Sequence, residues 1–202
     1  APYARVRPIQ EAGFQVLTYA DELLPCGYQK PAELAALIRA WEGLYDLVRP
    51  DVLIANSAPT ALLAARSRDI VTVTVGIGYE VPALSVPMPA FRFWDKTDIS
   101  VIQNHEKRIV SIINTALDML GHKSITALQD ILQTDLSYLT TFPEIDHYPL
   151  RTNGEYIGPS FVADVGNEID WLPRHEGRKR IFAYLSHGQH INSVIQALRS
   201  LP

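Results

Sequence analysis

Residues 51–75 read DVLIANSAPTALLAARSRDIVTVTV, and this stretch decides the fold class. Its first six residues form a nearly continuous apolar run of the kind that buried parallel strands show. Good helix formers then follow Pro59 as far as Arg68, and the β-branched run at 70–75 predicts another strand. A strand, a helix and a strand in this order form a βαβ unit with parallel strands and a right-handed crossover. We therefore predict an α/β protein with a Rossmann-like parallel sheet and flanking helices.

Further elements are predicted on both sides of this unit. Apolar residues at helical spacing predict a long helix over residues 31–48, with Pro31 in its first turn. Ser124 is suited to cap the start of a helix, and Gly121 to end one in the left-handed conformation. The remaining apolar patterns predict helices at 100–120, 124–133 and 190–201 and strands at 136–142, 155–159 and 180–186.

The segment between the second strand and the next helix, residues 76–97, reads GIGYEVPALSVPMPAFRFWDKT. Its glycines, prolines and aromatic residues are too irregular for a helix or strand. Loops of this length within a compact domain are usually functional or disordered. The apolar content of the segment favours packing against another part of the protein.

Composition excludes several classes of protein. The 202 residues carry a formal charge of −4, and the lysines and arginines are dispersed, so nucleic acid is not predicted as a partner. The single cysteine, Cys26, cannot form an internal disulfide, and no signal-peptide pattern is present, which predicts a cytoplasmic protein. No apolar run reaches the ~20 residues that a membrane-spanning helix needs.

Polar residues and glycines follow three predicted strands, where ligands of open α/β sheets bind. These places are Asn56-Ser57, Gly76–Glu80 and Ser186-His187-Gly188. Gly76 and Gly78 allow a ligand to approach the backbone, and the turn at Ser186 could supply donors to an anion. An ordinary tight turn is the alternative at each place.

No metal site is predicted. His105 opens the sequence HEKRI, in which Ile109 stands where a helical zinc site needs a second histidine. His187 and His190 lie close together but have no third ligand nearby. A loop or capping role is favoured for Asp146-His147, because neighbouring residues of a strand point to opposite faces.

Several motifs resemble one family when they are read in order. YADELLPCGYQKPAELAALIRAWEGLYDLVRPDVLIANSAPTALLAAR at 19–66, followed by VGIGYEVPALSVPMPAFRFWD at 75–95, resembles the acceptor-side domain of bacterial GT-B glycosyltransferases. TFPEIDHYPLR at 141–151 and EYIGP at 155–159 look like the last strands of that domain. RIFAYLSHG at 180–188 looks like the entry to the donor-binding domain of such enzymes.

This resemblance implies transfer of a sugar from a nucleotide diphosphate sugar to an acceptor hydroxyl, with inversion and without an essential metal. A base must take the acceptor proton, and fixed donors must hold the departing diphosphate. The resemblance assigns donor phosphate to Ser186. It assigns acceptor binding to Gly76, Gly78, Tyr79, Glu80, Pro87, Phe91, Phe93 and Trp94.

Two departures from the family concern catalysis. The Gly-rich loop that carries the basic histidine has no counterpart before Tyr19, and Asn56 stands where the family has the acidic residue that orients the histidine. An amide can hydrogen-bond an imidazole but cannot stabilise an imidazolium by charge. We therefore expect the chain to be inactive by itself.

The resemblance also predicts the domain organisation. Residues 1–160 would be an acceptor-side domain without its first strands, 161–179 a linker, and 180–202 the start of a donor-binding domain. The chain would then be the middle part of a larger protein. The donor-side signature for the base and sugar is not found.

Other hypotheses remain open. The missing histidine and Asn56 favour a non-catalytic binding or accessory protein on the same scaffold. An unrelated α/β enzyme that uses His187 and His190 is a third hypothesis. The predicted partners are a small-molecule acceptor and a nucleotide sugar. A partial sheet with exposed edge strands is also expected to associate with a second copy.

Overall fold

The computed structural model describes residues 2, 9, 14–148, 150–160 and 190–200. The chain divides into two units, residues 1–161 and 162–202. The first unit carries a sheet with its helices, and the described part of the second contains one helix. Each unit is treated by itself below.

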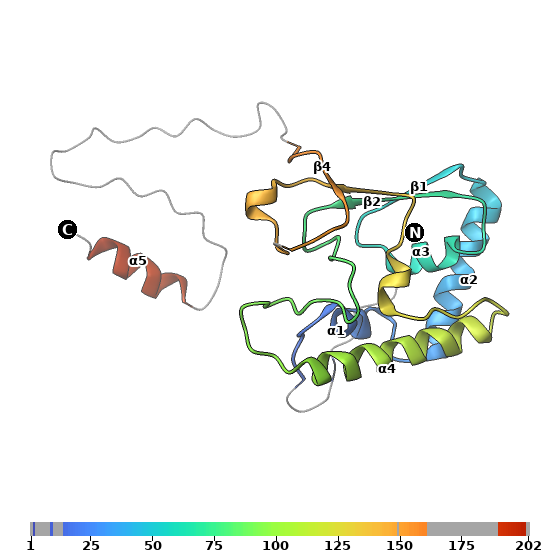
Figure 1. Ribbon diagram of the computed structural model, residues 1–202, viewed down its shortest axis with the longest axis horizontal. Coiled ribbons are helices and arrows are strands. Elements are labelled where there is room, and N and C mark those ends of the chain that lie inside the picture. Colours follow the sequence, from blue (N-terminus) through green and yellow to red (C-terminus); the bar gives the residue numbers. More distant parts are fainter. Residues whose placement is uncertain (1, 3–8, 10–13, 149, 161–189, 201–202) are drawn as a thin grey trace. The chain divides into compact units, whose positions relative to one another are not determined.

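The first unit is built on a four-stranded parallel sheet (Figure 1). The strands follow the sheet in chain order, β1 to β4. This result confirms the α/β class and the Rossmann-like parallel sheet with flanking helices. The strands are β1 (Val52–Ala55), β2 (Val71–Gly76), β3 (Leu136–Leu139) and β4 (Glu155–Tyr156).

The described residues also contain five α-helices and three 3₁₀ turns. Proline occupies the first turn of α2 and of α3, where the missing N–H costs nothing. The long helix predicted at 31–48 is confirmed. The helices are α1 (Tyr19–Leu23), α2 (Pro31–Val48), α3 (Pro59–Ala65), α4 (Ile99–Asp118) and, in the second unit, α5 (Ile191–Arg199). The 3₁₀ turns are η1 (Leu24–Cys26), η2 (Leu128–Ile131) and η3 (Pro143–Ile145).

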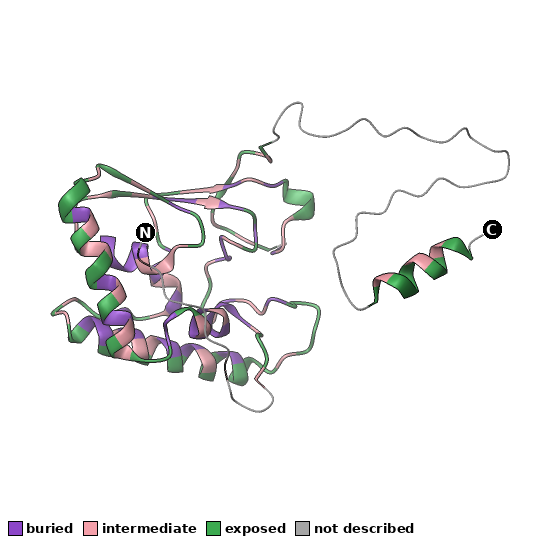
Figure 2. Ribbon diagram, turned by 180° about the vertical axis from the view of Figure 1, so that it is seen from behind, coloured by how far each residue is buried: buried purple, intermediate pink, exposed green. Residues whose placement is uncertain are grey.

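The two faces of the sheet differ sharply. Because the strand order rises steadily and such crossovers are right-handed, α3 and α4 lie on the same face (Figure 1). Ala55, Thr74 and Leu139 point to this face and are buried. Several apolar side chains of the opposite face are exposed: Val52, Ile54, Val71 and Leu136 are 50%, 70%, 47% and 47% exposed, whereas Val73 between them is buried. In Figure 2, the ribbon coloured by burial, α2, α3 and α4 all lie on the other side of the sheet.

The core lies between the covered face of the sheet and the helices. α2 contributes Leu34 and Ile38, and α4 contributes Ile109 and Ile113. α3 is buried on all sides, since Ala61, Leu62, Leu63, Ala64 and Ala65 are all buried. The core therefore holds the helices against one face of the sheet.

One predicted helix is wrong. In place of a helix at 124–133 the structure has only the short turn η2. The Asp130 carboxylate accepts hydrogen bonds from the N–H of Thr126, the hydroxyl of Thr126 and the N–H of Ala127. These side-chain bonds close a tight turn that competes with helix, so Ser124 caps nothing.

The remaining element predictions differ mainly in their ends. Gly121 has φ +72°, as predicted for the residue that ends α4. The third and fourth strands are shorter than the predicted 136–142 and 155–159. α5 corresponds to the helix predicted at 190–201, whereas the strand predicted at 180–186 lies outside the described residues. In the part of the chain that the structure describes, every helix is too short or too polar to cross a membrane.

Candidate functional site

The turn after β2 lies at the carboxyl edge of the sheet and is closed by the side chain of Asn56, the residue that follows β1. Nδ2 of Asn56 donates to the carbonyl of Val75 at 2.8 Å and to Oε2 of Glu80 at 3.1 Å. The same Oε2 accepts the N–H of Ile77 at 3.0 Å. Asn56 and Glu80, two residues predicted for the site, are thus brought together. Asn56 acts here as a donor that fixes the turn.

Glycine is required twice in this turn because other side chains fill the adjacent space. A Cβ at Gly76 would lie 2.8 Å from Oε2 of Glu80. A Cβ at Gly78 would lie only 1.9 Å from Oδ1 of Asp146, in the connection between β3 and β4. The close approach at both glycines is therefore made by the protein's own carboxylates.

Asp146 is the centre of a buried polar network. Nε of Arg151 and the hydroxyl of Tyr156 donate to its Oδ2, and the N–H of Tyr148 donates to its Oδ1. Burial by itself raises the pKa of Asp146, but the hydrogen bonds from Arg151, Tyr156 and Tyr148 outweigh it and lower the pKa. Asp146 is therefore an ionised structural anchor within its loop, the type of role that the sequence favoured.

Arg151 extends the network to the loop after β2. Its Nη1 donates to the carbonyl of Val81 at 2.7 Å, and its Nη2 donates to the carbonyl of Gly78 at 3.0 Å. Asn153 adds a hydrogen bond from the N–H of Leu84 at 2.9 Å. The connection between β3 and β4 thereby holds the first part of the 76–97 loop in place.

Tyr79 projects from this braced turn into a group of aromatic rings. Its ring centroid lies 4.9 Å from that of Phe91 and 5.7 Å from that of His147, which meets it edge-on. His147 in turn meets Tyr148 edge-on at 4.7 Å. Tyr79 remains 37% exposed and Phe91 is buried. The ring of Tyr79 is therefore an accessible aromatic surface that packs on the buried ring of Phe91.

A carboxylate from α1 joins these rings. Glu22 of α1 is half-buried and lies near Tyr79. Burial raises the pKa of Glu22, and the nearby Tyr79 only partly opposes this effect. Burial likewise raises the pKa of Tyr79 to about 12. The N–H of Phe91 donates to the carbonyl of Leu17 at 2.8 Å, which joins the loop to the segment just before α1.

Two polar atoms of this group are buried without a hydrogen-bond partner. They are Oη of Tyr148 and Nε2 of His147. Tyr148 is 3% exposed, so its hydroxyl cannot bond to bulk water. Buried polar atoms are nearly always paired in folded proteins, and an exception calls for an explanation. Both atoms belong to residues that contact each other in the aromatic group.

Other predicted site residues lie elsewhere. Pro87 lines a groove of about 440 Å³ along α4, together with the buried Glu106. Phe93 and Trp94 pair edge-on at 5.1 Å, and both are more than half exposed. Ser186 lies outside the described residues. The structure therefore gathers Asn56, Gly76, Gly78, Tyr79, Glu80 and Phe91 around one turn.

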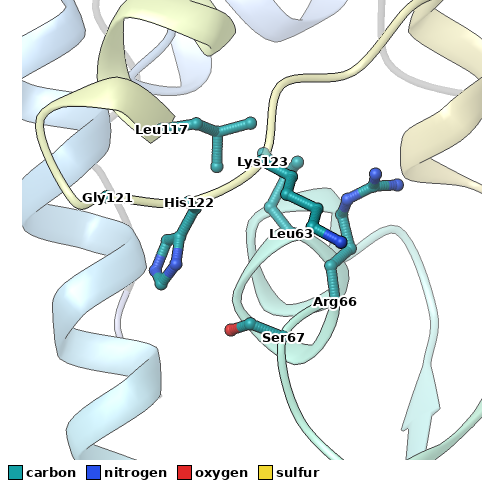
Figure 3. A pocket seen from close by; sticks show the side chains of 7 residues that line it. All are labelled: Leu63, Arg66, Ser67, Leu117, Gly121, His122 and Lys123. Atoms are coloured by element: carbon teal, nitrogen blue, oxygen red, sulfur yellow. The ribbon is translucent and has the colours of Figure 1, made fainter.

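A second pocket, of about 350 Å³, opens between the end of α3 and the end of α4 (Figure 3). Leu63 and Leu117 contribute its apolar wall, and Arg66 and Lys123 contribute cationic side chains (Figure 3). Arg66 already donates to the carbonyl of Asp130 at 2.8 Å. None of the residues predicted for the site lines this pocket.

An imidazole–carboxylate pair joins α4 to α1. Nδ1 of His105 lies 2.7 Å from Oδ1 of Asp21, although the contact is not aligned as a hydrogen bond. Oδ2 of Asp21 accepts the N–H of Leu17 and the N–H of Thr18 at the start of α1. Asp21 is therefore occupied in capping the start of α1. No cluster of three metal-ligating side chains occurs among the described residues.

The sequence did not indicate Glu22, His147, Tyr148 or Arg151 as members of one site. Glu22 and Tyr79 meet only because α1 packs beside the loop, a relationship that no local pattern reveals. The useful signals in the sequence were Asn56 after the first strand and the GIGYE segment after the second. No protein-family model matches the chain, and no curated protein and no solved structure is significantly similar to it.

Proposed function

We propose that the first unit is the acceptor-side domain of a glycosyltransferase-like protein of the GT-B fold. In this role it would bind a small molecule whose hydroxyl receives a sugar from a nucleotide diphosphate sugar. The donor-binding groups, Ser186 among them, would belong to the second unit. The observation that carries the proposal is the exposed Tyr79, held by the Asn56–Glu80 turn at the carboxyl edge of a parallel sheet.

The chemistry of this edge suits an acceptor. The exposed ring of Tyr79 can stack on an aromatic or sugar ring, and the buried Phe91 supports it from behind. The backbone of the turn is fixed by Arg151 and Asn56, so an acceptor would meet a preorganised surface. Phe93 and Trp94 would add further aromatic contacts from the same loop.

A non-catalytic binding protein is the second candidate. The side-chain amide of Asn56 donates both of its hydrogen bonds within the turn. An orienting residue would instead hold an imidazole, and no described histidine is hydrogen-bonded to Asn56. By itself the chain is therefore proposed to bind an acceptor without transferring sugar to it.

Acceptor binding is tested by titrating the ¹⁵N-labelled full chain with 4-methylumbelliferone, a phenolic acceptor. We expect the largest amide shifts within residues 76–94. Tyr79→Ala should weaken binding about fivefold, since a lost aromatic stack is worth ~1 kcal/mol and 1.4 kcal/mol is tenfold. Phe142→Ala is a matched control, because Phe142 is 48% exposed but lies outside the loop. Binding that persists unchanged in Tyr79→Ala contradicts the proposed acceptor site.

Transfer is tested separately by adding UDP-glucose to the full chain and the same phenol. We expect no glucoside, because among the described residues Asn56 orients no imidazole. Glucoside formed in proportion to the chain would overturn the proposed lack of activity. The two measurements together separate an acceptor-binding domain from an enzyme.

A further inference from the structure

The groove along α4 holds a buried carboxyl group with one free oxygen. Glu106 lines this groove and is only 7% exposed. Its Oε1 accepts the N–H of Met88 at 2.6 Å. No described residue donates to its Oε2, and Oε2 is not among the unpaired atoms that are sealed from solvent. The small exposed part of Glu106 therefore includes Oε2, which is open to the groove.

The charge of Glu106 is not balanced by the fold. No described lysine or arginine forms an ion pair with it. Lys107 also lines the groove, but it is exposed, and consecutive residues of a helix do not face each other. A buried charge without a partner is costly. Burial accordingly raises the pKa of Glu106, and only the hydrogen bond from Met88 opposes the rise.

The other polar side chains of the groove are either occupied or exposed. Nδ2 of Asn114 donates to the carbonyl of Ile125 at 3.0 Å, and its Oδ1 accepts the N–H of Ile125 at 2.8 Å. The hydroxyl of Thr126 donates to Asp130 at 2.8 Å. The three exposed ones are Gln103, Lys107 and Ser111. Glu106 is therefore the buried polar group of the groove that a ligand can reach.

The walls around Glu106 are mainly aliphatic. They come from three segments that are distant in sequence, namely the 76–97 loop, α4 and the η2 region. The volume of about 440 Å³ lies in the range of pockets that take small molecules, which combine apolar walls with a few polar groups. The apolar lining residues are Val86, Pro87, Val110, Ala127 and Leu128.

We propose that this groove binds a small aliphatic amine in its protonated form. The ammonium group would donate to Oε2 of Glu106, and the carbon skeleton would lie against Val110 and Leu128. An ammonium concentrates three donors and a positive charge at one point, which suits a single free oxygen. A planar guanidinium or amidinium would instead need both oxygens for its paired hydrogen bonds. The groove shares only Pro87 with the residues predicted for the acceptor, so the inference does not rest on the proposed function.

The test titrates the ¹⁵N-labelled full chain with cyclohexylamine and with cyclohexanol, which present the same ring and differ in the polar group. A pH of 8 lies below the pKa of aliphatic amines and well above the ordinary pKa of a carboxyl group. We expect the amine to bind at least about tenfold more tightly, because a charge-assisted hydrogen bond is stronger than a neutral one. The largest amide shifts should fall at residues 106–114 and 126–128. Equal affinity for the two compounds overturns the inference.

A variant of Glu106 assigns the preference to its carboxylate. Glu106→Gln keeps an oxygen for the N–H of Met88 and removes the charge, so it should lower the affinity for cyclohexylamine at least about tenfold and leave cyclohexanol nearly unchanged. Glu144→Gln removes the same charge from an exposed position outside the groove and should change neither affinity. If Glu106→Gln keeps the preference for the amine, the inference fails.

A second pair of variants tests the groove without touching Glu106. Ser111→Trp places a large ring into the groove from an exposed position of α4 and should weaken both compounds. Asn104→Trp is the control, because Asn104 is equally classed as exposed on α4 but does not line the groove. Thermal unfolding checks that both variants fold. Unchanged cyclohexylamine binding in folded Ser111→Trp would place the amine elsewhere and overturn the inference.

The outcomes also separate this inference from the proposed function. A preference for the amine that depends on Glu106, together with no binding of 4-methylumbelliferone, would support the groove site and overturn the acceptor site. Binding of the phenol that depends on Tyr79, without any amine preference, would overturn the groove site alone. Absence of binding by every compound would overturn both.

Discussion

The guanidinium of Arg151 and the carboxylate of Asp146 form an ion pair whose side chains are 2% and 0% exposed. The pair joins the connection between β3 and β4 to the loop after β2, through the carbonyls of Gly78 and Val81. Each charge has several hydrogen bonds, which is the condition under which a buried pair is tolerated. The loop that presents Tyr79 therefore depends on this contact.

Arg151→Met should destabilise the fold by about 3–5 kcal/mol, because it leaves the Asp146 carboxylate buried and uncompensated. Urea unfolding measures the change. Arg68→Met provides the comparison, since Arg68 pairs with the exposed Asp46 and exposed pairs contribute little. Equal shifts of the two unfolding midpoints would show that Arg151 is not a buried anchor.

Gly78→Ala should destabilise the protein by about 1–3 kcal/mol, because the new methyl would overlap Oδ1 of Asp146 and that carboxylate is held from several sides. Gly43→Ala is a control that should change the stability in the opposite direction. Gly43 lies inside α2 with open space around it, so alanine there should stabilise the helix by about 0.5–1 kcal/mol. Thermal unfolding of both variants checks the pair, and stabilisation by Gly78→Ala would contradict the geometry.

Glu106 should make stability depend on pH. Burial raises its pKa above the ordinary 4.5, and the hydrogen bond from the N–H of Met88 opposes this only in part. The folded protein therefore holds the proton more tightly than the unfolded chain, and stability is lost as pH rises from 4.5 through the raised pKa. Wild type should thus lose unfolding free energy relative to Glu106→Gln across that range.

Urea unfolding of both proteins at a series of pH values measures this difference. The pKa of Glu22 is also raised by burial, but Glu22 is present in both proteins, so its contribution cancels in the difference between their unfolding free energies. A constant difference across the series would mean that Glu106 titrates normally.

Asn56→Asp should cost about 1 kcal/mol of stability, because Asn56 donates to the Val75 carbonyl and to Glu80, and aspartate cannot donate. Two carboxylates would also face each other. Adding Glu80→Gln to this variant should restore part of the loss, since the new amide can donate to the aspartate. Chemical unfolding of both single variants and the double variant measures the coupling, and purely additive effects would count against the contact.

The fold was predictable where the signals are local. α2 follows from Pro31 and the apolar spacing of residues 31–48, and β1 and β2 follow from runs of strand-forming residues. The predicted helix at 124–133 failed because the side chain of Asp130 bonds the backbone of Thr126 and Ala127. Helix propensity describes the average preference of each residue type. It does not include a particular side-chain hydrogen bond that competes with the backbone bonds of a helix.

The candidate site was predictable only at its backbone. The glycines and Tyr79 of GIGYE marked the turn, but the partners of that turn come from distant segments. Arg151 reaches Gly78, and Glu22 reaches Tyr79, only after the strands and helices have packed. A single sequence contains no periodic pattern for contacts of this kind.

The exposed face of the sheet affects how the protein behaves in solution. No described helix of the first unit covers Ile54 or Leu136. Higher temperature and sulfate both strengthen hydrophobic association, so both should promote aggregation of the protein. Hydrophobic association weakens on cooling, which favours cold, sulfate-free buffers for purification and storage. The face of the sheet opposite α3 and α4 should therefore limit the concentration at which the protein stays in solution without aggregating.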